Sequence, residues 1–322
     1  MEDTWKKYWI TLLKEKKLQG YIRELDEMDQ LEGNDPQTEK ICHDIYDDYS
    51  HFMHKYEDTR EHLIREIENL PGVHLHTSRV KILESLLQKV IEKRHGNLGD
   101  KSNLYSKICV DNYKDIITDL VGIRLIISYR GDWRELHRAI VSKFPYVDTE
   151  LYKKHCFIPH RAGENIIAEI PKVYYAYGDS TDMYKEELVA CEMHKNNYRS
   201  VHYILSFEGV YVELQTRTIY DEAWSDCDHR YVYKHDENIS YTALRQLSAV
   251  LCDFTNAAND LGEQMRMIFE RTPVLDSGAN GYATSQDVYD HIQRIFQRFE
   301  ETQKKFSDFR SMLSVREGES ND

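Results

Sequence analysis

The chain has 322 residues, with 42 Lys and Arg against 56 Asp and Glu, so its formal net charge is −14 at pH 7. This acidic balance argues against a broad basic coat for long nucleic acids, and a polyanion must therefore bind at a local cluster of cations. Gly and Pro number only 14 and 6, which argues against disorder and favours a helix-rich globular protein of about two or three domains.

The sequence carries no signal for export or for a membrane. No stretch reaches the ~18–20 consecutive apolar residues that a membrane span requires, and the first residues lack the charged-then-apolar pattern of a secretory signal. The cysteines are widely spread without a CxxC pair, which fits a reducing compartment. They are Cys42, Cys109, Cys156, Cys191, Cys227 and Cys252. We expect a cytoplasmic protein with no membrane partner.

Residues 1–74 predict an N-terminal helical region. Apolar residues recur near the 3.6-residue period of an α-helix from Trp5 to Leu13 and again from Ile41 to Tyr56. The polar run 32–36 contains Gly and Pro and predicts a turn between these helices.

Residues 75–236 alternate helix and strand patterns and indicate an α/β domain. Leu120–Ser128 is short and β-branched, as expected of a buried strand. Ser200–Phe207 alternates in polarity, and a Glu-Gly turn leads into Val210–Gln215, so these two segments predict a β-hairpin. Thr77–Lys81 leads into the first of three predicted helices, which are Ile82–Arg94, Arg134–Phe144 and Ile219–His229.

The stretch before the hairpin and the stretch after it show different sequence patterns. Residues 150–195 are polar and irregular, with a possible strand at Lys172–Tyr175. Residues 237–322 predict a C-terminal helical region, with a long helix over 244–268, a break with Gly and Pro at 272–281, and a last helix over 288–299. These helices pack either on the core or on another subunit, so a homo-oligomer is a possible assembly.

The first candidate site is a basic stripe. Lys81, Ser85, Lys89 and Lys93 recur every four residues, so on a helix they share one face, close to Arg79. Cations at the amino-terminal end of a helix suit a polyphosphate, because the helix dipole adds to their field. Lys-rich helix faces are also common on protein surfaces, so the stripe alone favours a solvated face.

The second candidate site consists of acids beside strands. Asp119 directly precedes the strand that contains Arg124. Glu213, Gln215 and Arg217 alternate, so they share one face of the second hairpin strand. Two acids from separate strands could hold one partly hydrated Mg²⁺ together with substrate phosphates. A wet face of an edge strand would show the same alternation.

An aromatic residue lies among cations just before the first hairpin strand. The run from His194 to His202 contains Lys195, Tyr198 and Arg199. An exposed Tyr198 could stack on a nucleobase. The alternative is a loop tyrosine that packs against the sheet edge.

Together these segments resemble the RelA/SpoT synthetase domain, in order and rough spacing, over about residues 75–236. The matching pieces are Arg79-x-Lys81, Asp119-Leu120-Val121-Gly122-Ile123-Arg124, Asn197-Tyr198-Arg199-Ser200-Val201-His202 and Glu213-Leu214-Gln215-Thr216-Arg217-Thr218. Trp224 and the run 229–234 look like the helix that follows this strand in the family. The resemblance implies a mixed β-sheet, nucleotidyltransferase-like α/β (α+β) core that is flanked by helices.

The resemblance also implies a reaction and residue roles. These synthetases transfer pyrophosphate from ATP to the ribose 3′-hydroxyl of GDP or GTP and release AMP. Asp119 and Glu213 match the catalytic acids that hold Mg²⁺, and Glu213 lies beside the acceptor hydroxyl. The ATP-binding positions are Arg79, Lys81, Ser85, Lys89 and Arg124. The acceptor-binding positions are Lys195, Asn197, Tyr198, His202, Gln215 and Arg217.

The chain departs from the family pattern at two places. Asn197 stands where family members usually carry Gly before the stacking Tyr, and Asn tolerates positive φ better than most residues. Residues 150–195 are longer than in compact members and are a candidate gate or acceptor-selecting insert. The length leaves no room for a companion hydrolase domain, so we expect a synthetase-only enzyme, similar to small alarmone synthetases.

Other functions remain open at this point. A toxic relative would pyrophosphorylate tRNA 3′ ends or adenine nucleotides, and it could be controlled by an antitoxin. A tRNA acceptor requires a basic surface, for which the candidates are Lys153, Lys154, His155, His160 and Arg161. The remaining alternative is a catalytically inactive regulatory or assembly module.

Overall fold

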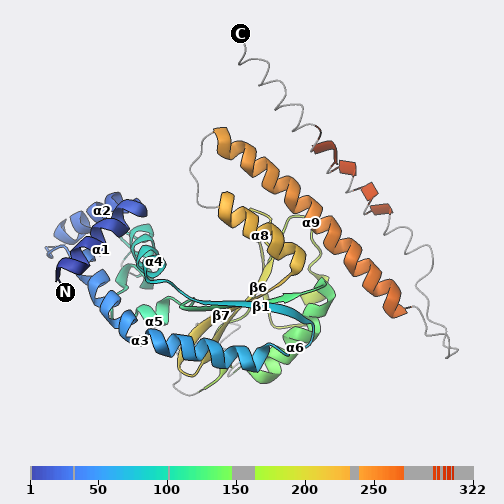
Figure 1. Cartoon of the computed structure of the whole chain (residues 1–322), viewed down its shortest axis with the longest axis horizontal. Coiled ribbons are helices and arrows are strands. Elements are labelled where there is room, and N and C mark those ends of the chain that lie inside the picture. The colour runs from blue at the N-terminus through green and yellow to red at the C-terminus, as the bar shows by residue number, and fades with distance from the viewer. Residues whose placement is uncertain are drawn as a thin grey trace, which may run out of the picture.

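The computed structural model describes residues 2–31, 33–100, 102–146, 164–232 and 239–271, and scattered positions between 293 and 307. Its centre is a seven-stranded mixed sheet with helices on both sides. Figure 1 shows α8 and α9 on one side of the sheet, α3 and α6 on the other, and α1, α2 and α4 gathered at one end. The α/β fold class predicted from the sequence is confirmed.

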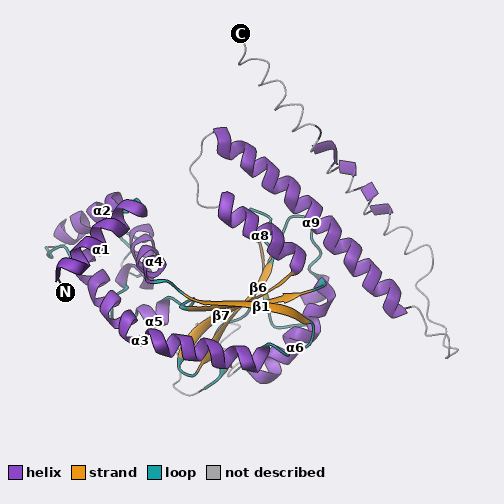
Figure 2. Cartoon of the chain, viewed as in Figure 1, coloured by secondary structure: helices purple, strands orange, loops and turns teal. Residues whose placement is uncertain are grey.

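The strand order in the sheet is β1-β2-β7-β6-β4-β5, and β3 pairs with β6. The pairs β2–β7 and β4–β5 are parallel, and the others are antiparallel. Figure 2 shows the strands crossing the centre of the molecule between the two helical layers. The strands are β1 (Val73–Val80), β2 (Val121–Ile127), β3 (Ile166–Ile167), β4 (Lys172–Tyr175), β5 (Ala190–Met193), β6 (Ser200–Phe207) and β7 (Val210–Thr218).

The helices cover the sheet and extend beyond it. The long helix α3 packs on β1 and β2, and α8 packs on both α9 and β7. The α-helices are α1 (Glu2–Glu15), α2 (Gln19–Leu31), α3 (Thr38–Ile67), α4 (Leu83–Gly96), α5 (Tyr113–Ile116), α6 (Trp133–Lys143), α8 (Ile219–Tyr231) and α9 (Ile239–Arg271). Short 3₁₀ turns are η1 (Leu104–Lys107), η2 (Arg130–Asp132) and η3 (Asp182–Tyr184).

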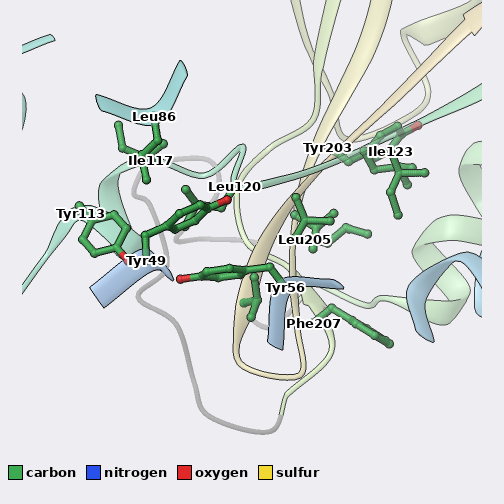
Figure 3. Close-up of a cluster of buried hydrophobic side chains, with 14 of the residues drawn as sticks. Tyr49, Tyr56, Leu86, Tyr113, Ile117, Leu120, Ile123, Tyr203, Leu205 and Phe207 are labelled. Carbon is green, nitrogen blue, oxygen red and sulfur yellow. The ribbon is translucent and has the colours of Figure 1, made fainter. Parts of the chain in front are cut away.

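The core under the sheet is built around buried tyrosines. Tyr49 and Tyr56 of α3 stack with their ring centroids 5.0 Å apart, and Tyr113 of α5 contacts Tyr49 edge-on. Figure 3 shows these rings beside the aliphatic side chains of the sheet's inner face. The Tyr49 hydroxyl donates a hydrogen bond of 2.6 Å to the carbonyl oxygen of Lys81. The core therefore reaches directly to a predicted site residue.

Most predicted elements are confirmed, with small shifts at their ends. The hairpin is β6 and β7, and the strand at 120–128 is β2. The possible strand at Lys172–Tyr175 is β4, and the long tail helix is α9. Most of the helix predicted at 288–299 lies outside the described residues. The division into regions 1–74, 75–236 and 237–322 stays a prediction.

One prediction near the site is wrong. Lys81 does not lie on a helix with Ser85, Lys89 and Lys93, because β1 runs through Val80 and α4, the helix predicted at 82–94, begins at Leu83. Lys81 therefore lies between strand and helix, not on a common helical stripe with Ser85 and Lys89. The polar residues of β1 hide its strand character, which comes from pairing with β2. The short strands β3 and β5 were missed for the same reason, since pairing and not periodicity defines them.

Within the described ranges, the structure contains no helix that is both long enough and apolar enough to cross a membrane.

Candidate active site

Strand register brings the predicted site residues to one face of the sheet. Arg79 on β1 lies opposite Gly122 on β2, and Gly122 lies beside Glu213 on β7. One step along, Gln215 lies between Arg124 of β2 and His202 of β6. Residues that are paired across neighbouring strands point to the same side of the sheet. The opposite side carries the buried aliphatic core.

At one end of this face, two lysines converge on Asp119. Lys81 Nζ lies 2.7 Å and Lys89 Nζ lies 2.9 Å from Asp119 Oδ2. The exposed fractions are 8% for Lys81, 16% for Asp119 and 33% for Lys89. The inner pair, Lys81 and Asp119, is therefore largely shielded from solvent. Burial raises the pKa of Asp119, but the two lysines outweigh this and hold it below its usual range.

The second carboxylate oxygen of Asp119 departs from the rule that buried polar atoms have hydrogen-bond partners. Asp119 Oδ1 is buried and has no hydrogen-bond partner among the residues that the structure describes. A buried polar atom without a partner is costly and is uncommon in native proteins. Asp119 therefore has an oxygen ready to accept a ligand.

Local chain geometry explains how Lys81 and Lys89 both reach Asp119. The Lys81 amide donates a hydrogen bond of 2.8 Å to Leu120 O, which ties the end of β1 to the start of β2. Lys89 reaches the same carboxylate from α4. Lys93 is turned elsewhere, with its ammonium 4.5 Å from the ring centre of Tyr105. Ser85 is half-buried in the first turn of α4.

Glu213 forms the centre of a second group on the same face. His202 Nδ1 lies 3.4 Å from Glu213 Oε1, and Gln215 donates a hydrogen bond of 2.8 Å to Glu213 Oε2. Burial raises the pKa of Glu213 and Asp119 adds to this, yet His202 and Gln215 hold it below its usual range. Glu213 is therefore an anion near neutral pH, within the electrostatic reach of Asp119.

Tyr198 continues this network toward the cleft. Its hydroxyl lies 2.9 Å from His202 Nε2 and accepts a hydrogen bond of 2.6 Å from Arg217. The Arg217 guanidinium lies 5.1 Å from the Tyr198 ring centre, and it also donates a hydrogen bond to Gln215. Four of the predicted acceptor residues therefore form one connected cluster with Glu213.

Arg124 and Arg217 are joined by an acid that sequence reasoning missed. Glu222 Oε1 lies 3.0 Å from Arg124, and Glu222 Oε2 lies 3.1 Å from Arg217. Glu222 lies in the first turn of α8, which follows β7 directly. Two arginines on a partly buried face need a counter-charge. The sequence signal that could have found Glu222 was an acid in the first turn of the helix after the strand that carries Arg217.

Glu213 and its network line an open cleft of about 530 Å³, whereas Asp119, Lys81 and Lys89 are not among its wall residues. Its wall residues are Arg79, Arg124, Tyr174, Glu192, His194, Asn196, Tyr198, His202, Glu213, Gln215, Arg217, Trp224, Ser225, Asp226, Asp228 and His229. The wall includes His194 and Asn196 but not the predicted acceptor residues Lys195 and Asn197. Asn197 has φ 58, so the expected left-handed conformation at the position of the family glycine is confirmed.

Sequence reasoning missed two aromatic residues of the cleft and one acid within electrostatic reach of Glu213. Tyr174 and His194 face Tyr198, with ring centroids 6.0 and 5.4 Å from it. Glu169 has its pKa raised by burial and also by the charge of Glu213. These residues come from the stretch 164–195, where no periodic pattern marks them. The basic residues considered for tRNA, 153–161, lie outside the described residues.

A comparison with protein families decides the identity of this domain. The model described as "Region found in RelA / SpoT proteins" matches residues 78–238. The chain belongs to the RelA/SpoT family. The matched range contains every residue predicted for the site, and the resemblance identified from the motifs is confirmed.

Solved structures share only low sequence identity with this RelA/SpoT protein. The small alarmone synthetase 1 from Bacillus subtilis is 18% identical, with a TM-score of 0.46 over 70% of this chain and 97% of that one. A GTP pyrophosphokinase family protein from Streptococcus pneumoniae is 16% identical, with a TM-score of 0.45 over 71% and 98% of the two chains. Such values assign no substrate to this chain. No curated protein is similar enough to match it.

Proposed function

We propose that the chain is a (p)ppGpp synthetase, which transfers the pyrophosphate group of ATP to the 3′-hydroxyl of GDP or GTP and releases AMP. The observation that carries the proposal is that Asp119, held by Lys81 and Lys89, lies within electrostatic reach of Glu213 and its network. Family membership supports the same reaction class.

Cations would bind the donor at the Asp119 end. Lys81 and Lys89 contact Asp119 at this end, and Arg79 and Arg124 line a hollow with Glu213; a polyphosphate is the ligand that such cations favour. Lys89 is the most exposed partner of Asp119, so it is free to turn from the carboxylate toward a phosphate. Phosphoryl transfer depends mainly on alignment and on neutralising charge, which these side chains supply.

Glu213 would act on the acceptor. A carboxylate that remains ionised at neutral pH can accept a hydrogen bond from a ribose hydroxyl and take its proton. His202 lies on one side of Glu213 and orients it, while Gln215 donates to its second oxygen. Tyr198 lies at the far end of the same network, where it can stack on the acceptor base.

The donor set fits a magnesium ion. Mg²⁺ prefers carboxylate oxygens, water and substrate phosphates. Asp119 would hold the ion through Oδ1, which no described residue engages, and Glu213 would face it from the acceptor side. When bound, the ion would neutralise charge on the phosphate oxygens. Among the described residues there is no group of three or more protein ligands, so phosphates and water would complete the shell.

A labelling experiment tests the proposal. The purified full chain is incubated with γ-labelled ATP, either alone or with GDP, GTP or deacylated tRNA. We expect label in the guanine nucleotide and an equal amount of AMP. Label in tRNA or in an adenine nucleotide would overturn the proposed acceptor. A folded protein that transfers no label to any acceptor would indicate the inactive regulatory module.

A matched pair of variants ties the reaction to the site. Glu213→Gln removes the charge at the centre of the acceptor network and should abolish transfer. Glu208→Gln changes another acid of the same hairpin, which contacts the exposed His62, and should keep full transfer. Equal activity of the two variants would remove Glu213 from the mechanism.

A further inference from the structure

Tyr198 is presented to the cleft by a turn that needs external support. Asn197, the residue before it, has φ 58. Asn adopts this conformation more readily than other residues with a Cβ, but it is still less at ease there than glycine, so its surroundings help to hold it. Within the turn, the Asn197 amide donates a hydrogen bond of 3.1 Å to His194 O.

The residue after Tyr198 supplies such support from the other side of the loop. Tyr198 lines the active-site cleft, whereas Arg199 lines a second cavity of about 360 Å³ together with Asp179. Arg199 Nε and Nη2 donate to the two oxygens of Asp179 over 2.7 and 3.0 Å, so the pair is bidentate. The side chains are only 12% and 14% exposed.

Asp179 is itself fixed to its own loop. Its Oδ2 accepts a hydrogen bond of 2.9 Å from the amide of Ala176. Burial alone would raise the pKa of Asp179, but the hydrogen bonds and charge of Arg199 hold it below its usual range. Bidentate pairs between Arg and a carboxylate are directional as well as strong. The loop 176–179 therefore fixes the direction of the Arg199 side chain.

Helix α9 contacts both Arg199 and the Asn197 turn. Arg199 Nη1 lies 3.4 Å from Asn197 O and 3.5 Å from Cys252 Sγ, and Cys252 Sγ is 4.0 Å from the same carbonyl oxygen. One turn earlier, Ser248 accepts a hydrogen bond from the Trp224 indole, and Trp224 lines the cleft. Figure 1 shows α9 running along α8 above the sheet.

We propose that Asp179, Arg199 and Cys252 form a clamp that positions Tyr198 for the acceptor nucleotide. These residues act through the backbone of the Asn197 turn, so they are positioning residues. The family match ends at residue 238, and Cys252 lies beyond it on α9. The clamp thus makes α9 and the loop 176–179 parts of the acceptor site. This inference rests on the proposed function, because it assigns Tyr198 to the acceptor.

Separate binding measurements on the full chain test the clamp. Asp179→Asn keeps the shape of the side chain and removes its charge. We expect its GDP dissociation constant to rise about tenfold, as after the loss of one base-stacking contact, with the value for a non-hydrolysable ATP analogue changed less than twofold. Arg199→Lys keeps the charge but loses the bidentate pair, and it should show the same selective loss. Asp179→Glu should recover part of the affinity.

An ion pair away from both cavities provides the matched control. Arg138 on α6 contacts Glu187 of the stretch before β5 over 3.0 Å, and its side chain is 62% exposed. Arg138→Gln should leave both dissociation constants unchanged. Circular dichroism checks that each variant is folded. Unchanged GDP binding by folded Asp179→Asn and Arg199→Lys would overturn the clamp. Equal weakening of both ligands would also overturn it, because it would show a general structural role.

A measurement without nucleotide separates this inference from the proposed function. Amide hydrogen exchange of residues 194–199 in the free protein should become faster in Asp179→Asn, while exchange in β2 stays as in wild type. Unchanged exchange in 194–199 would overturn the clamp, whatever the acceptor is. Wild-type protein that binds the ATP analogue but no guanine nucleotide, with the exchange effect present, would overturn only the acceptor assignment.

Discussion

Asp119→Asn is the substitution that tests most directly how the donor end is held together. Asp119 compensates two lysines, and the Lys81 side chain is only 8% exposed. Removing one partner of a buried ion pair costs about 3–5 kcal/mol, since the remaining charge stays buried and unpaired. Asn keeps the shape and one acceptor oxygen, so we expect the free energy of unfolding to fall by about 3 kcal/mol, the lower end of that range.

Urea unfolding, followed by circular dichroism, measures this difference. The slope with denaturant should stay constant while the midpoint falls. Lys89→Met is the control, because it leaves the inner pair intact and removes a cation that is 33% exposed; it should cost less than about 1 kcal/mol. An Asp119→Asn protein within about 0.5 kcal/mol of wild type, the range of neutral surface changes, would refute a structural role for the pair.

The pH dependence of the same difference has a defined sign. The lysines hold the folded-state pKa of Asp119 below its usual range, so its contribution is complete above the unfolded pKa of about 3.9. The contribution is then lost as pH falls through the folded-state pKa. The midpoints of wild type and Asp119→Asn should therefore converge below about pH 4. A gap that widens in acid would contradict this assignment.

Three further substitutions test other parts of the structure by urea unfolding. Tyr49→Phe removes the buried hydrogen bond to Lys81 O and should cost about 1–2 kcal/mol; no loss would mean that the carbonyl finds another partner. Gly72→Ala places a Cβ at φ 76 and 3.0 Å from Asp132 Cβ, and should cost about 1–2 kcal/mol. Burial lowers the pKa of His137 to about 4, so wild type should lose up to about 3 kcal/mol between pH 6.5 and 4. His137→Gln should lack this loss, and equal acid sensitivity would refute the assignment.

Periodicity was a sufficient guide for elements whose burial is regular. The hairpin β6–β7 alternates in polarity and turns at a Glu-Gly pair, and both strands lie where the pattern predicts. Helix α9 was also predictable, because its apolar residues recur at helical spacing. The strand β1 was not, since its sequence Val-His-Leu-His-Thr-Ser-Arg-Val is mostly polar. Its partner β2 supplies the hydrogen bonds that make it a strand.

The candidate site could be predicted only in part, for a related reason. The family resemblance assigned Lys81 and Lys89 to ATP and Asp119 to Mg²⁺, and the structure brings these three side chains into contact. Glu222 and Asp179 were missed; Glu222 pairs with Arg124, 98 residues away, as well as with nearby Arg217, and Asp179 lies 20 residues from Arg199. Arg124 is paired with Glu222, and Arg199 with Asp179. Counter-charges of buried arginines depend on the fold, so a single sequence indicates that they are needed but not where they are.

The parallel pairing of β2 with β7 determines the chemistry of the face. In the observed register, Gly122 stands beside Glu213, and Arg124 stands beside Gln215. Because the side-chain period of a strand is two residues, a slip of one residue would turn Glu213 toward the core and bring Leu214 to the cleft. Leu214 is fully buried, so such a slip would expose an apolar side chain and bury a carboxylate. Burial of the core face therefore holds the acid in place, and the stability of the sheet and the position of Glu213 depend on the same alternation.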